Sequence, residues 1–144
     1  MRLVVDANIL VGEALRARGR ALIADERLEL FVAARAWEEA RHEQRRRAAL
    51  LLQRGRVTDV QATELTATLH RLVATHIAVI PETVYRLSEV VARARIPRDQ
   101  DDSPTVAVAL TLAAGIWTND GDFLGCGCPT WTTDTLLAEI SGWR

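Results

Sequence analysis

Carboxylates are concentrated in one part of this sequence. Five of its nine aspartates fall between residues 99 and 122, and a sixth, Asp6, directly follows the apolar run 3–5. Carboxylates that share a cleft repel one another and raise each other's pKa, so such a group is stable mainly when a cation lies among them. No arginine lies between residues 99 and 122, whereas Mg²⁺ and Mn²⁺ prefer oxygen ligands. The spacing therefore predicts a divalent-metal site, whose chemistry would be hydrolysis of a phosphodiester.

Three of these aspartates are expected to share one cleft. Asp6 follows the first apolar run and Asp120 follows another at 116–118, and both runs are typical of short buried strands. In an open parallel sheet, ligands bind beyond the carboxyl ends of the strands, so both carboxylates would lie at one edge. Asp102 precedes a helix start that contains Pro104, where the helix dipole favours an ionised side chain. We therefore interpret these three aspartates as functional.

The patterns around these residues predict alternating strands and helices. Apolar or alternating runs predict five strands, over 3–5, 28–32, 77–80, 116–118 and 129–132. Helical spacing predicts helices over 8–19, 34–53, 58–73, 84–94, 103–114 and 133–140. Gly19 is expected to end the first helix, and Thr133 or Asp134 to cap the last. This alternation is typical of an α/β fold with a mainly parallel sheet, and residues 1–144 are predicted to form one domain.

The sequence contains no lysine, because all 18 of its cationic residues are arginine. This excludes a P-loop, a kinase-type site and Schiff-base catalysis, each of which needs a lysine. It also excludes the receiver-type signalling domains, which cluster aspartates around Mg²⁺ but pair the phosphoryl group with a lysine. The Asp-x-Asp pattern of haloacid-dehalogenase phosphatases fails as well, because Asn8 stands at its second acidic position.

Four segments, in chain order, resemble the motifs of the PIN-domain nuclease family, the fold of VapC-type toxin ribonucleases. They are Val4–Leu10, Trp37–Ala40, Asp101–Leu110 and Ile116–Phe123. The resemblance covers almost the whole chain. It implies a three-layer α/β/α domain with about five strands in the order 3-2-1-4-5, an acidic pocket that binds Mg²⁺ or Mn²⁺, and hydrolysis of RNA that leaves a 5′-phosphate.

The resemblance also assigns roles to individual residues. The catalytic acids that it implies are Asp6, Glu39, Asp102 and Asp120. The metal ligands would come from Asp6, Asp102, Asp120 and the accessory acid Asp122. Asn8 and Thr118 match polar positions that orient the carboxylates or metal-bound waters. Because acidic residues are doubled at two sites, Glu38 and Asp101 stay open as alternatives to their neighbours.

The net charge of −1 is a near-cancellation of two blocks. Residues 41–56 contain six arginines and one glutamate, whereas residues 99–122 contain five aspartates and no arginine. One interpretation of the first block is a solvated helix face. The other is a strip that guides RNA phosphates, with Arg41, Arg45 and Arg46 as the candidates.

The remaining expectations concern partners and location. Many members of the resembled family are toxins blocked by a small antitoxin, often as dimers, so an antitoxin and a homodimer are both expected partners. The apolar helices over 60–73 and 84–94 are candidate dimer faces. No apolar run is long enough for a membrane span, and the two cysteines form no disulfide framework, so a cytoplasmic location is predicted. The alternative functions are a non-catalytic module that binds RNA or protein, and a nuclease directed at DNA.

Overall fold

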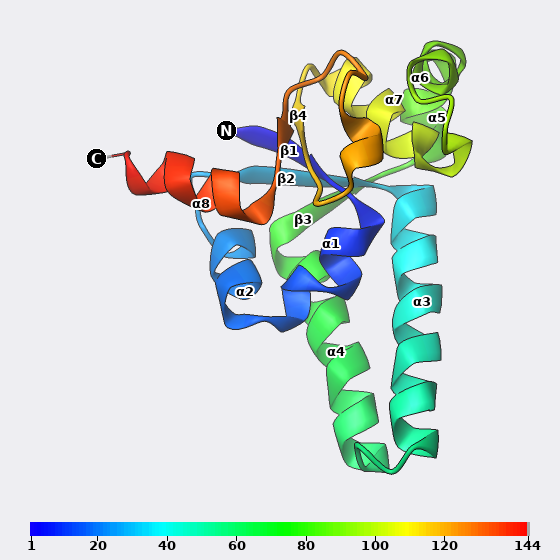
Figure 1. Cartoon of the computed structure of the whole chain (residues 1–144), viewed down its shortest axis with the longest axis vertical. Coiled ribbons are helices and arrows are strands. Elements are labelled where there is room, and N and C mark those ends of the chain that lie inside the picture. Colours follow the sequence, from blue (N-terminus) through cyan, green and yellow to red (C-terminus); the bar gives the residue numbers. More distant parts are fainter. Residues whose placement is uncertain (144) are drawn as a thin grey trace.

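The structure, a computed structural model, describes residues 1–143 and is organised around a parallel sheet. Five strands form this sheet in the order β3-β2-β1-β4-β5 (Figure 1). Their bounds are β1 Arg2–Val5, β2 Glu29–Ala33, β3 Ile77–Ile80, β4 Gly115–Trp117 and β5 Thr130–Trp131. Every neighbouring pair is parallel. The predicted α/β class and strand order are therefore confirmed, and the carboxyl ends of all five strands point to one edge.

Helices cover both faces of the sheet. The α-helices are α1 Ala7–Val11, α2 Ala17–Ile23, α3 Ala34–Gln53, α4 Asp59–His76, α5 Glu82–Tyr85, α6 Glu89–Arg95, α7 Ser103–Leu112 and α8 Thr133–Ser141. Short 3₁₀ turns cover η1 Glu13–Leu15, η2 Arg86–Ser88, η3 Gln100–Asp102 and η4 Gly121–Phe123. In Figure 1, α5, α6 and α7 lie above the sheet, and α1, α2 and α4 lie below it. No helix among residues 1–143 is long and apolar enough to cross a membrane.

Helix α7 is the most deeply buried helix segment near the candidate acids. It packs against β1, β2 and β4 on one side and against α6 on the other. Its residues from Ser103 to Ala109 are all buried, as its almost uniformly apolar sequence predicts. Because α7 is packed on both sides, the residue that precedes it, Asp102, is positioned at the carboxyl edge of the sheet.

Helices α3 and α4 form a long hairpin that projects beyond the sheet (Figure 1). Thr58 begins α4 with a reciprocal cap, in which its hydroxyl accepts from Gln61 N (3.1 Å) and the Gln61 side chain accepts from Thr58 N (2.9 Å). Between the helices, the buried Gln44 accepts a hydrogen bond of 3.0 Å from the Thr66 hydroxyl. The predicted bounds of α3 are confirmed.

Two predicted helix boundaries are wrong. Helix α1 ends at Val11, and Gly19 lies inside α2. Glycine is required there by close packing, because a Cβ atom would overlap the carbonyl group of Glu13. At the other end of the chain, Thr132 caps α8 in place of Thr133 or Asp134, since its hydroxyl accepts from Thr135 N at 3.1 Å.

The segment 84–94 is not the single helix that its spacing predicts. It is divided into α5, η2 and α6, and the residues that it buries are Tyr85, Glu89 and Ala92. The apolar side chains whose spacing predicts the helix are exposed, namely Val84, Leu87, Val90 and Val91. In the other candidate dimer helix, Leu69 and Val73 are buried within the fold.

Candidate functional site

Asp6 lies where β1 ends and α1 begins, and it is only 2% exposed. Its backbone N–H donates to the carbonyl of Trp117 in β4 at 3.0 Å, and its own carbonyl accepts from Ile9 N at 3.0 Å. These two bonds continue the sheet and start the helix. They fix the carboxylate at the carboxyl edge, where the apolar-run-then-aspartate pattern predicts it.

Thr118 joins two of the predicted acids through one hydroxyl group. Its Oγ1 donates to Asp6 Oδ2 at 2.8 Å and accepts from the backbone N–H of Asp120 at 3.0 Å. Thr118 itself is buried and directly follows β4, where its N–H donates to Trp131 O at 2.9 Å. The side chain therefore sets the position of Asp6 and the course of the chain at Asp120 together.

Asp102 is the residue that most clearly lacks a partner. It stands immediately before α7, but its side chain makes no capping bond to that helix. Its Oδ2 atom is buried and has no hydrogen-bond partner in the part of the chain that the structure describes. A buried carboxylate oxygen without a donor is costly. This position would therefore be stabilised by a cation or by a proton.

The pKa values show that the acids act on one another. Burial raises the pKa of Asp6 to about 6, with Asp120 and Glu39 acting in the same direction against the hydrogen bond from Thr118. Burial also raises the pKa of Asp102 to about 8, and the negative charges of Asp6, Asp99, Asp120 and Glu39 add to it. Four acids from separate elements thus face a common region.

The doubled acids at positions 38 and 39 are separated by the structure. Glu39 raises the pKa of Asp6 and of Asp102, and its own pKa is raised by burial and then by the charges of Asp101 and Asp99. Both side chains are exposed, but only Glu39 acts on the two aspartates. The structure therefore turns Glu39, and not Glu38, toward the other acids.

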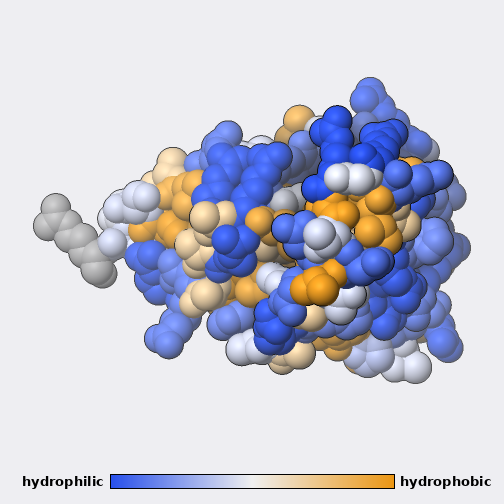
Figure 2. All heavy atoms as spheres, turned by 90° about the horizontal axis from the view of Figure 1, so that it is seen from below, coloured by the Kyte–Doolittle hydropathy of each residue, from blue (hydrophilic) through white to orange (hydrophobic). Residues whose placement is uncertain are grey.

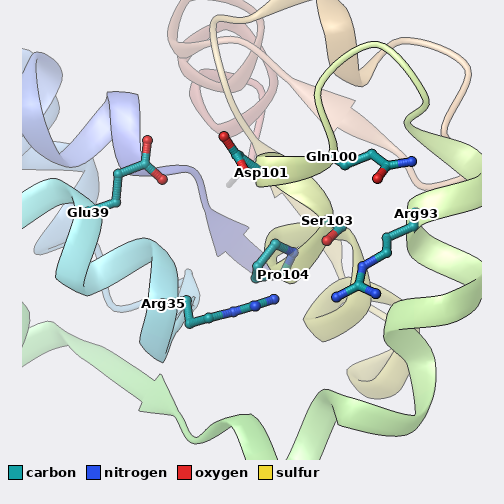
Figure 3. Close-up of a pocket in the computed structure, with 7 residues that line it drawn as sticks. All are labelled: Arg35, Glu39, Arg93, Gln100, Asp101, Ser103 and Pro104. Atoms are coloured by element: carbon teal, nitrogen blue, oxygen red, sulfur yellow. The ribbon is translucent and has the colours of Figure 1, made fainter.

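Asp101 and Asp102 also differ in what they face. Asp102 is close enough to Asp6 and Asp120 for their charges to raise its pKa. Asp101 is exposed and lies with Glu39 at a cavity of about 580 Å³ (Figure 3). Asp102 thus belongs with Asp6, Asp120 and Glu39, which we call the inner acids, and Asp101 lies at the border of this group.

Two further predicted residues lie outside this inner group. Asp122 donates its backbone N–H to Asp120 Oδ1 at 2.9 Å, but its side chain lines a different cavity, together with Arg95 and Arg98. Asn8 is exposed, and its side chain makes no hydrogen bond among residues 1–143. The structure therefore gives Asp122 a backbone role in shaping the turn at Asp120.

The predicted arginine strip is only partly free. The guanidinium of Arg41 lies over the ring of Trp37, 5.3 Å from its centroid. Arg46 donates to Glu43 at 2.7 and 3.0 Å, and Arg47 donates to the same carboxylate at 3.0 Å. Arg45 is exposed on the same helix. Internal ion pairs thus reduce the charge that this strip can offer to a ligand.

The inner acids fit a divalent cation that keeps much of its water. Among residues 1–143, no three Asp, Glu, His or Cys side chains are close enough together to form a direct metal cage. The donors are nevertheless all carboxylate oxygens, and Asp102 Oδ2 is unpartnered. Mg²⁺ and Mn²⁺ suit such a set, because Mg²⁺ in particular is bound through one or two carboxylates and retained waters.

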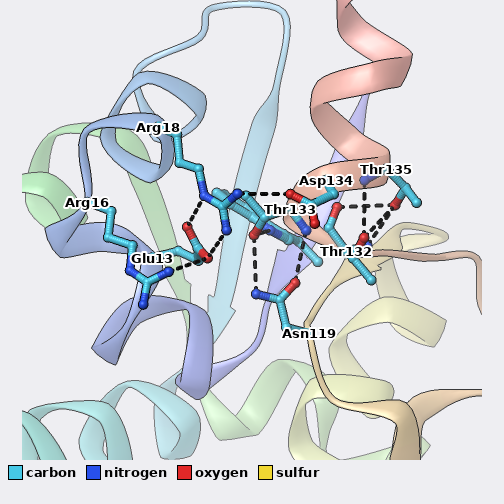
Figure 4. Close-up of polar contacts among 9 residues, drawn as sticks. Glu13, Arg16, Arg18, Asn119, Thr132, Thr133, Asp134 and Thr135 are labelled. Atoms are coloured by element: carbon cyan, nitrogen blue, oxygen red, sulfur yellow. Dashed lines mark hydrogen bonds and ion pairs between the residues drawn. The ribbon is translucent and has the colours of Figure 1, made fainter.

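A polar network next to Asp120 was not found by sequence reasoning (Figure 4). The buried Glu13 accepts from Arg18 at 2.8 and 3.1 Å, and Arg18 also donates to Asp134 at 2.9 Å. Asn119 accepts from Thr133 N at 2.9 Å, which joins the loop before Asp120 to α8. These contacts anchor the loop that carries Asp120. The only sequence signal was the place of Asn119 in the fourth motif.

A family model decides which family this arrangement represents. The PIN domain model matches residues 4–141 of the chain. The chain belongs to the PIN domain family. The match includes all of the acidic residues discussed above, so the resemblance stated from four motifs is confirmed.

Solved structures show the same fold. PAE2754 from Pyrobaculum aerophilum has 20% identity and a TM-score of 0.73, with 98% of this chain and 90% of that one covered. VapBC2 from Rickettsia felis, bound to a DNA fragment from its promoter, has 11% identity and a TM-score of 0.65, with 92% and 98% covered. A toxin–antitoxin complex from Klebsiella pneumoniae has 14% identity and a TM-score of 0.56, with 91% and 97% covered. No curated protein matches the sequence.

Proposed function

We propose that this PIN domain is a metal-dependent ribonuclease, with Asp6, Glu39, Asp102 and Asp120 as its catalytic acids. The observation that carries the proposal is Asp102, a half-buried carboxyl group with one buried, unpartnered oxygen, whose pKa is raised by the charges of Asp6, Asp120 and Glu39. Carboxylates held together against their repulsion, in a family of nucleases, support a role in binding Mg²⁺ or Mn²⁺. RNA is proposed as the substrate on the family resemblance, because the geometry of the acids does not itself distinguish RNA from DNA.

The residues of this chain would do three things in such a reaction. Asp6 and Asp102 would lose their protons and bind the cation, and their raised pKa values make this step depend on the cation. Thr118 would hold Asp6 in place, and Glu39 would orient water at the border of the site. When bound, the metal ion would lower the pKa of a water molecule and neutralise charge on the phosphodiester. Asp122 would support the site through its backbone bond to Asp120.

We further propose that the enzyme is the toxin of a toxin–antitoxin pair, with a small antitoxin as its partner. The fold shared with the Klebsiella pneumoniae toxin–antitoxin complex supports this assignment. The molecule also has apolar surface for a partner. Figure 2 faces the free end of the α3–α4 hairpin and shows hydrophobic side chains among hydrophilic ones, and Leu52 and Val60 are exposed in this part of the chain. The free cysteines Cys126 and Cys128 fit a reducing compartment such as the cytoplasm.

A non-catalytic module that binds RNA or protein is the second candidate. One observation favours it: across residues 1–143 the acids do not form a ready-made cage of three metal-binding side chains. The two functions differ in whether the acids are needed for turnover or only for shape. A single substitution that removes charge and preserves volume therefore separates them.

The test is cleavage of a panel of single-stranded and structured RNAs, and of DNA, in Mn²⁺. The nuclease proposal expects cleavage of RNA that is abolished by EDTA and reduced by more than about 100-fold in Asp6→Asn, since a lost ligand costs more than a lost supporting contact. Asp59→Asn, on the exposed start of α4, is the matched control and should cleave normally. Cleavage that survives Asp6→Asn would show that the acids are wrongly assigned. Binding of RNA with no cleavage of any substrate would establish the binding module.

A further inference from the structure

A cavity lined by charged side chains lies directly beside the inner acids. Its volume is about 580 Å³, which is in the range of small-ligand sites. Arg35 of α3 and Arg93 of α6 extend toward each other across it (Figure 3). Glu39 and Asp101 lie on its other side, and Ser103 and Pro104 of α7 lie between. The cavity therefore has one cationic side and one anionic side.

The two arginines are held by a single carboxylate that the proposed reaction does not use. Glu89 is buried, and its two oxygens accept from Arg35 Nη2 at 2.6 Å and from Arg93 Nη2 at 3.1 Å. Two guanidinium groups against one carboxylate leave a net positive charge. The ion pairs also fix both side chains at the cavity, which reduces the entropy that a ligand would otherwise have to remove.

Both guanidinium groups keep unused donors. A guanidinium has five N–H donors, and within residues 1–143 each of these two makes a hydrogen bond only to Glu89. The Nε atom of Arg35 is buried and has no acceptor in the described chain. The side chains are 39% and 49% exposed, so an anion in the cavity can reach them. A planar guanidinium group with free N–H donors can bind two oxygens of a phosphate at once.

We propose that Arg35 and Arg93 form a phosphate subsite for the RNA strand, next to the acids that would bind metal. This inference rests on the proposed nuclease function, and it assigns the phosphate adjacent to the scissile one to the arginine side of the cavity. The scissile phosphate then lies on the side of Glu39 and Asp102. A nucleic acid fits both sides, because its scissile phosphate is neutralised by the metal ion while its neighbour is neutralised by arginine. An acidic protein segment fits only the arginine side and is repelled by Glu39 and Asp101.

Arg93 is the residue to change, because Arg35 then still pairs with Glu89 and no buried charge is left alone. The binding probe is a fluorescein-labelled single-stranded RNA of mixed sequence, measured by anisotropy on the Asp120→Asn background to prevent cleavage. Loss of one phosphate contact should reduce the slope of log K against log salt by about 0.7. Arg93→Gln should show this change, and Arg93→Lys should restore most of it. Arg71→Gln, an exposed arginine of α4 that does not line the cavity, is the matched control and should leave the slope unchanged.

The outcomes separate this inference from the proposed function. With Asp120 restored, Arg93→Gln should raise KM several-fold with kcat nearly unchanged, because the subsite binds substrate away from the reacting atoms. If the protein cleaves RNA but Arg93→Gln changes neither slope nor KM, the subsite is wrong and the nuclease function stands. If RNA binding depends on Arg93 but no RNA is cleaved in Mn²⁺, the subsite stands and the nuclease function fails. If Arg93→Gln weakens binding of a labelled decaglutamate peptide but not of RNA, the cavity binds protein carboxylates and the proposal is overturned.

Discussion

At the scale of single residues, one hydroxyl group does the most to order the acids. Thr118 donates to Asp6 and accepts from the backbone at Asp120, so it fixes the distance between β1 and β4 at their carboxyl ends. Its donation also opposes the rise in the pKa of Asp6 that burial causes. A methyl group at this position would remove the hydroxyl donor and leave the Asp6 carboxylate with the backbone N–H of Ala7. Thr118 is therefore a positioning residue.

Thr118→Val tests that role. The substitution keeps the shape of the side chain but removes both hydrogen bonds, and we expect cleavage in Mn²⁺ to fall by about 10–100-fold, as for other contacts that orient metal-binding carboxylates. Activity should also require more Mn²⁺, because Asp6 is then protonated over a wider pH range. Thr118→Ser retains the hydroxyl and should recover most of the activity. Equal activity and equal Mn²⁺ dependence in Thr118→Val and the unchanged protein would contradict the role.

Residue types and spacing were sufficient to predict that the acids lie near one another but not to predict the arginine pair. The positions of Asp6 and Asp120 could be predicted because each comes at or shortly after the end of an apolar strand, and that of Thr118 because it lies in a recognisable motif. Arg35 and Glu89 are 54 residues apart and meet only through packing of α3 against the α6–α7 unit. Local pattern holds no signal for such a contact. The formal charge of residues 41–56 overstates the positive charge available to a ligand, since Glu43 forms ion pairs with both Arg46 and Arg47.

At the scale of elements, the apolar segment 84–94 shows where periodicity misleads. Two stripes with helical spacing run along it, and the more apolar one, from which a single helix is predicted, is exposed. The structure buries the other stripe, because Glu89 is needed between Arg35 and Arg93 and because Tyr85 and Ala92 fill the space against α7. By contrast α3, whose pattern had no competing stripe, has the predicted bounds.

This exposed stripe gives a prediction about assembly. Leu87 is 94% exposed and Val90 is 75% exposed, and exposed apolar surface of this kind marks protein contacts. Glu82 and Arg86 flank Leu87 with opposite charges, so the face can pair with a second copy of itself around a two-fold axis. We expect a homodimer in light scattering and a monomer for Leu87→Glu, with Leu124→Glu, also strongly exposed, as the matched control. A clean monomer of the unchanged protein at high concentration would contradict this.

At the scale of the whole molecule, the parallel sheet brings acids that are far apart in the sequence to one edge. Asp6, Glu39, Asp102 and Asp120 are spread over most of the chain, and they converge because β1 and β4 end at one edge where α3 and α7 begin. The near-zero net charge gives no sign of this arrangement, since the acids are gathered at one edge of the sheet and most of the arginines lie elsewhere. The convergence concentrates negative charge in a buried place, and the fold must tolerate this charge whenever no cation is bound.

The stability of the whole molecule should therefore fall as the pH rises when metal is absent. Asp6 and Asp102 have pKa values of about 6 and about 8, both above the value of an unfolded aspartate. Above about pH 5, where the lowered pKa values of Asp25 and Glu43 no longer contribute, the folded state thus holds more protons than the unfolded state, and its free energy of unfolding must decrease up to pH 8. Urea unfolding in EDTA should show the loss, and Mn²⁺ should reverse it by binding the ionised acids.

Asp102→Asn removes the largest contribution to this loss of stability, so it should be more stable than the unchanged protein in EDTA at pH 8. We expect a gain of about 1–3 kcal/mol, a value discounted for the partial exposure of this side chain. A flat stability profile between pH 5 and 8 in EDTA, or a destabilised Asp102→Asn, would show that the acids do not share the electrostatic strain on which the metal site depends.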